Sequence, residues 1–87
     1  MSTAYDPELH TLRSIARSTD GRDRQELESA RFNLFAALER GATHEARRWS
    51  RALRVALLAY EPGAGVDGEE LRSAGLAALE VIESGLG

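Results

Sequence analysis

Apolar residues recur every three or four positions through four stretches of the sequence, and this periodicity limits the fold more than any other feature. Such spacing places apolar side chains on one face of an α-helix, whereas a half-buried strand alternates apolar and polar residues. Alternating runs are absent, and the chain holds only five valine or isoleucine residues. The pattern predicts an all-α fold, a small four-helix bundle or helical-hairpin array with short loops, with helices at about 7–18, 21–40, 44–60 and 68–86.

Start and stop signals support these bounds. Acidic or hydroxyl side chains at helix starts can accept hydrogen bonds from free backbone N–H groups, and we expect such caps at Asp6, Asp20, Thr43 and Asp67. Gly41 is expected to end the second helix in a left-handed conformation, which a residue without Cβ adopts at little cost.

The 87 residues are expected to form one domain, with a flexible N-terminus at 1–5 and a flexible glycine-rich loop at 61–66. A chain of this size buries only about 60% of the surface that its unfolded form exposes. A core this thin favours completion by a partner chain.

The only tryptophan, Trp49, falls in the middle of the apolar stripe of the third predicted helix, flanked by alanines. We therefore expect its large ring to be the centre of the core and to pack against Leu34, Phe35 and Leu38. The expected core positions are Leu9, Leu12, Ile15, Ala16, Leu27, Ala30, Arg31, Leu34, Phe35, Ala37, Leu38, Ala46, Trp49, Leu53, Ala56, Leu57, Tyr60, Leu71, Ala74, Gly75, Ala78, Leu79, Ile82 and Leu86.

Four apolar residues miss these stripes, namely Phe32, Val55, Leu58 and Leu76. One interpretation is that the third helix packs on two sides, or that these are the isolated exposed apolar residues common on protein surfaces. The other is that they form a surface for self-association or for a partner protein.

Charge is divided unevenly along the chain. Residues 41–60 carry four arginines, Arg47, Arg48, Arg51 and Arg54, against one acid, whereas residues 61–87 carry six acids against one arginine. The four arginines predict either a solvated face that pairs with the acidic fourth helix, or a surface for an acidic partner or for phosphates.

Catalytic constellations are missing from the sequence. The chain has no cysteine and no lysine, which excludes thiolate and Schiff-base chemistry. His10 and His44 lack a second histidine at metal-binding spacing, so we expect no metal, no cofactor and no enzymatic activity. A helix-turn-helix centred on Gly41 fits poorly, because it would bury Arg47 and Ser50.

Residues 33–41, followed by Glu45-Ala46 and later by Glu61-Pro62, resemble one tetratricopeptide-type helical hairpin over about 30 residues. No second copy is visible, and repeat proteins need about three units for stability. The resemblance implies a helical-hairpin scaffold for interactions rather than a repeat protein.

Together these observations predict a non-catalytic protein-protein interaction or regulatory module that binds another protein and associates with itself, as a dimer. The alternative is a regulatory nucleic-acid-binding protein that uses the four arginines of residues 47–54. The arginine- and alanine-rich composition favours a bacterial source. The lack of a leader and of any apolar run near 18 residues favours a cytoplasmic location without membrane contact.

Overall fold

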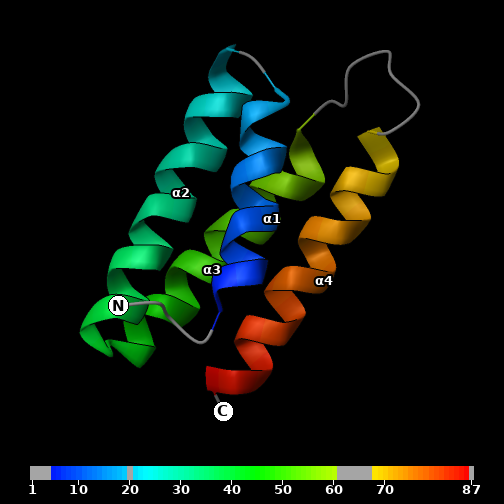
Figure 1. Ribbon diagram of the computed structural model, residues 1–87. Coiled ribbons are helices and arrows are strands. Elements are labelled where there is room, and N and C mark those ends of the chain that lie inside the picture. The colour runs from blue at the N-terminus through cyan, green and yellow to red at the C-terminus, as the bar shows by residue number, and fades with distance from the viewer. Residues whose placement is uncertain (1–4, 20, 61–67, 87) are drawn as a thin grey trace.

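The computed structural model describes residues 5–19, 21–60 and 68–86, which form four helices and no strand. The helices are α1 (Asp6–Arg17), α2 (Gly21–Arg40), α3 (Thr43–Ala59) and α4 (Gly68–Leu86). Successive helices run antiparallel (Figure 1). The all-α prediction is confirmed, and each predicted helix lies within one residue of its observed bounds. The expected caps at Asp20 and Asp67, the loop at 61–66 and the first four residues lie outside the described part of the chain.

Each helix packs against two others, so that the four form a closed bundle (Figure 1). Helix α1 contacts α2 and α4, and α3 contacts the same two helices. The backbones of α1 and α3 do not approach each other in the described part of the chain, and neither do those of α2 and α4; these diagonal pairs meet only through core side chains. The bundle therefore has two opposite layers, one of α1 and α2 and the other of α3 and α4.

The core is built mainly from leucine and alanine. The four core positions predicted on α1 are all buried, and so are Leu27 and Leu34 on α2. Ala30 and Ala37, predicted at the edge of the α2 stripe, are buried as well, whereas Phe35 and Leu38 are only partly covered. The buried stripe of α2 is thus rotated toward its alanines, whose small side chains allow close packing.

Trp49 is not the centre of the core. Its side chain is half-buried at the edge of α3, while the next residue, Ser50, has 0% exposure. Ser50 shares its helix face with Ala46 and Leu53, and leucines from the other helices occupy the bundle axis. The indole instead lies along a groove between α2 and α3, beside Ala52. The inward positions next to Trp49 are held by Ala46 and Ser50, whose small side chains allow the helices to pack closely.

The turn between α2 and α3 follows the prediction for its glycine. Gly41 has a φ of 69°, its N–H donates to the Leu38 carbonyl at 3.2 Å, and the Ala42 N–H donates to the Ala37 carbonyl at 2.9 Å. This pair of bonds is the Schellman arrangement, which satisfies the last carbonyls of α2.

The expected caps at Thr43 and Asp6 are wrong by one residue. Thr43 is the first residue of α3 and Ala42 is its N-cap, without a side-chain hydrogen bond. The short turn already uses Ala42 to close α2, so the helix begins directly after it. Asp6 is likewise the first residue of α1, after an N-cap at Tyr5.

Helix α4 lies close to both α1 and α3 at Gly75. A Cβ at this position would lie 2.7 Å from Ile15 Cδ1 and 3.0 Å from Leu57 Cδ1. The neighbouring Ala74, predicted in the core, is exposed because it faces away from this contact. Leu76, predicted off the stripe, is half-buried against the core.

Candidate interaction surfaces

Two of the four arginines of residues 47–54 hold α3 against α4. Arg54 forms an ion pair with Glu83 of α4. Arg47 Nη2 donates to the main-chain carbonyl of Leu86 at 3.0 Å. A cation at this point satisfies a free carbonyl in the last turn of α4 and complements the negative end of its dipole. Both side chains therefore act within the chain, as the first interpretation of these arginines expects.

Arg72 makes the reciprocal contact from α4 to the end of α3. Its Nε donates to the Leu57 carbonyl at 2.9 Å, and its Nη2 donates to the carbonyl of Tyr60. Nη1 donates to Glu69 at 2.8 Å. Because α3 has no basic residue in its last turn, this arginine supplies the missing C-terminal cation from a neighbouring helix. The sequence feature that could have indicated this contact is that Arg72 is the only arginine in the acidic segment at residues 61–87.

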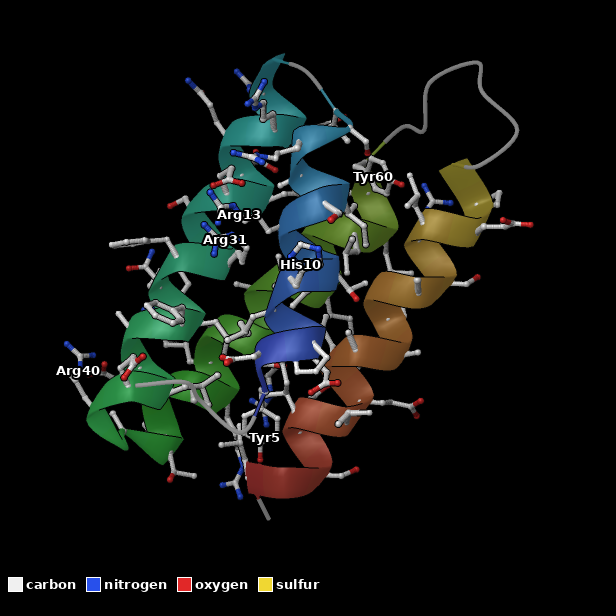
Figure 2. All side chains as sticks on the ribbon, in the orientation of Figure 1. Tyr5, His10, Arg13, Arg31, Arg40 and Tyr60 are labelled. Carbon is white, nitrogen blue, oxygen red and sulfur yellow. The ribbon has the colours of Figure 1, made fainter. Side chains whose placement is uncertain are left out.

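Tyr60 completes this junction, where α3 ends and α4 begins (Figure 2). Its ring lies 5.1 Å from the Arg72 guanidinium carbon, and its hydroxyl donates to the Gly68 carbonyl at 3.1 Å. Burial raises the pKa of the Tyr60 hydroxyl; the Arg72 charge opposes this change, and Glu69 adds to it. Hydrogen bonds and the contact between Arg72 and the Tyr60 ring therefore join the end of α3 to the start of α4.

The outward side of α3 carries the remaining two arginines. Arg48 and Arg51 are exposed and form no ion pair with any described residue. Val55 and Leu58 follow on the same side of the helix, with 66% and 59% of their surface exposed. Val55 also borders the groove between α2 and α3. Four and three residues separate Arg51, Val55 and Leu58, so their side chains form one line along α3.

Helix α4 borders this line with one apolar and one acidic residue. Leu76 lies four residues after Arg72 and seven before Glu83, and both of these contact α3, so Leu76 lies on the edge of α4 that faces α3. Glu80, one turn further on, is exposed. We call this surface the α3–α4 face; it consists of Arg48, Arg51, Val55, Leu58, Leu76 and Glu80.

Phe32 does not join this surface. It is 60% exposed, but it lines a groove of about 400 Å³ between α1 and α2, with His10 and Arg13 from α1. Because α1 and α2 form the opposite layer of the bundle, the four off-stripe residues divide between two faces. Val81 on α4 is a further exposed apolar residue, at 51%, that sequence analysis did not single out.

The described residues contain no group of three or more His, Asp or Glu side chains that could hold a metal ion. His10 and His44 are exposed on α1 and α3, two helices whose backbones are not adjacent. None of the described helices combines the length and the apolar character needed to cross a bilayer.

No known family, curated protein or solved structure matches the chain. The function has to be argued from its own surfaces.

Proposed function

We propose that the protein is a non-catalytic, cytoplasmic interaction module that dimerises through the α3–α4 face. The observation that carries this proposal is the line of Arg51, Val55 and Leu58, where two large apolar side chains are exposed directly beside a cation that forms no ion pair with a described residue. Exposed apolar groups rimmed by charge are typical of surfaces that a partner covers.

A two-fold axis parallel to the helices gives this face a matching partner in a second copy. Such an axis places α3 of one copy over α4 of the other, twice, which is the self-complementary arrangement of a symmetric dimer. Arg51 then lies near Glu80 of the second copy, and Leu58 near its Leu76. The arginine-rich α3 and the acid-rich α4 therefore complement each other across the interface.

The composition of the face, rather than its size, predicts a weak dimer. Stable interfaces bury about 800 Å² on each partner. Helix α3 has 17 residues and is about 25 Å long, so two adjacent helices supply an area of that order. Only two strongly exposed apolar residues lie at the centre of the face, and we therefore expect a Kd of about 10–100 µM.

Sedimentation equilibrium with a double variant tests the apolar part of the interface. Val55→Ser/Leu58→Ser removes exposed apolar surface without disturbing the core, so it should give a monomer where the parent chain dimerises. Val81→Ser is the matched control, because Val81 is also about half exposed but lies outside the face. A parent chain that stays monomeric in the high micromolar range contradicts the proposal, and so does equal loss of dimer in the control.

A charge exchange tests the orientation of the two copies. Arg51→Glu should weaken the dimer by placing two acids opposite each other, and adding Glu80→Arg should restore it. Lack of restoration, with both variants folded by circular dichroism, would exclude the proposed axis but leave the Val55/Leu58 test standing.

A phosphate surface is the second candidate, favoured by a hollow lined by His44, Arg47, Arg48 and Arg51. Arg47 and Arg54 are already bonded to α4, so only Arg48 and Arg51 are available in full. Binding of a DNA or RNA duplex should then fall with a salt slope that corresponds to about two phosphate contacts. A gel-shift titration of the parent and of Arg48→Glu/Arg51→Glu tests it, and equal binding by both removes this candidate.

A further inference from the structure

The groove between α1 and α2 lies in the layer opposite the α3–α4 face. Its volume is about 400 Å³, and Phe32 and Phe35 line it from α2. Phe32 is 60% exposed. Phe35, one turn further along, is half-buried, so the same groove is able to cover an aromatic ring. Phe32 thus presents an aromatic ring that the described residues leave largely uncovered.

Cationic side chains border the same groove from both helices. Arg13 of α1 and Arg31 of α2 both line it, and their side chains lie near each other where the two helices meet (Figure 2). One acidic residue, Asp6 in the first turn of α1, also lines the groove. Arg31 Nη2 donates to Glu28 at 3.2 Å, and its Nε is buried without a partner among the described residues. Arg13 forms no ion pair within the described ranges. The exposed Arg13 guanidinium and the part of the Arg31 guanidinium that does not bond Glu28 therefore keep hydrogen-bonding capacity that no described residue uses.

The shape of the groove selects a helical occupant. It lies between two antiparallel helices, and a third helix packs naturally into such a valley. Helix α1 has 12 residues and is about 18 Å long, so an occupant of three to four turns would follow its whole length. An apolar stripe would cover Phe32, and acidic side chains beside that stripe would meet Arg13 and Arg31.

We propose that the α1–α2 groove binds an amphipathic helix of a partner protein that carries acidic residues beside its apolar stripe. The inference does not depend on dimerisation, because the groove and the α3–α4 face share no residue. The protein then has two separate surfaces, one for a second copy and one for a different partner.

Two designed peptides of about 14 residues test the recognition of charge. Both carry leucines at helical spacing and a fluorescein label; the first has glutamates beside the leucines, and the second has lysines at the same positions. Fluorescence anisotropy should show that the acidic peptide binds at least about tenfold more tightly than the basic one. Equal binding of both peptides, or no binding of the acidic peptide at up to about 1 mM protein, overturns the proposal.

Variants of the groove locate the binding. Phe32→Ser and Arg13→Glu change exposed residues, so both variants should stay folded. Each should lower the affinity for the acidic peptide by about tenfold or more. Val55→Ser, on the opposite layer, is the control and should leave peptide binding unchanged. Unchanged binding in Phe32→Ser overturns the assignment of the groove. A lower sedimentation mass in Phe32→Ser also overturns it, because the occupant is then a second copy of this chain.

Discussion

The two sides of α3 use their arginines differently. On the side that meets α4, arginine side chains bond to the neighbouring helix, whereas on the outward side they are exposed to solvent. Arg47 and Arg54 bond to Leu86 and Glu83 of α4, while Arg48 and Arg51 have no ion-pair partner in the described residues. All four have the same chemistry and nearly the same place in the sequence. Their roles differ because rotation about the helix axis decides which side chain reaches a carbonyl or a carboxylate.

The charge of a helix therefore says little about its partner until the helix is placed in the bundle. The basic segment at residues 41–60 suggests a surface for acids or phosphates, but half of its arginines act within the chain. The remaining half adjoins exposed Val55 and Leu58, and that combination of charge and apolar surface is what supports a protein partner.

Leu57→Ala should have the largest effect on stability, because Leu57 is fully buried on the inner side of α3. A buried leucine replaced by alanine costs about 2–5 kcal/mol, a large part of the stability of so small a domain. Trp49→Ala should cost clearly less, since Trp49 is only half-buried. Urea unfolding of both variants checks the order, and a larger loss for Trp49→Ala would place the indole back at the centre of the core.

Arg72→Ala should come next, with a loss of about 2 kcal/mol, because it leaves the Leu57 and Tyr60 carbonyls at the end of α3 without their charged donor. Arg48→Ala is the control and should change the free energy of unfolding by less than about 0.5 kcal/mol. Thermal and urea unfolding measure both. Similar losses in the two variants would mean that the bonded and the solvent-facing arginines do not differ in role.

Tyr60→Phe should cost about 1 kcal/mol near neutral pH, since it removes the hydrogen bond to the Gly68 carbonyl. Burial raises the folded pKa of Tyr60 above its ordinary value of 10.0, so the folded state holds this proton more tightly than the unfolded state. The free energy of unfolding should therefore fall as pH rises past 10.0 and level off above the folded pKa. Unfolding of both proteins between neutral and alkaline pH measures this, and an equally steep fall in Tyr60→Phe would contradict the role of Tyr60.

The Arg54–Glu83 ion pair should contribute least, because both side chains are about one-third exposed. A double-mutant cycle with Arg54→Ala and Glu83→Ala should give a coupling energy of about 0.2–1 kcal/mol that decreases in high salt. The matched cycle of Arg51→Ala and Glu80→Ala in the monomer should give a value near zero. A larger coupling in the second cycle would show that the outward arginine is paired within the chain.

The sequence was enough to predict the four helices and their bounds to within one residue. It also predicted the four core positions of α1 and the left-handed turn at Gly41. These features depend on local interactions: helical spacing of apolar residues, and glycine at a position that requires positive φ. The exposure of Phe32, Val55 and Leu58 was predictable for the same reason, because all three lie off the apolar stripes of their helices.

Only the tertiary structure decided how each helix is rotated about its own axis. Periodicity defines a face about 100° wide, and within that width the packing of neighbouring helices selected Ser50 rather than Trp49 for the interior. The same rotation paired Arg47 and Arg54 with α4, brought Arg72 to the end of α3, and separated Phe32 from Val55. These outcomes depend on contacts between residues far apart in the chain, and no local pattern of residues carries that information.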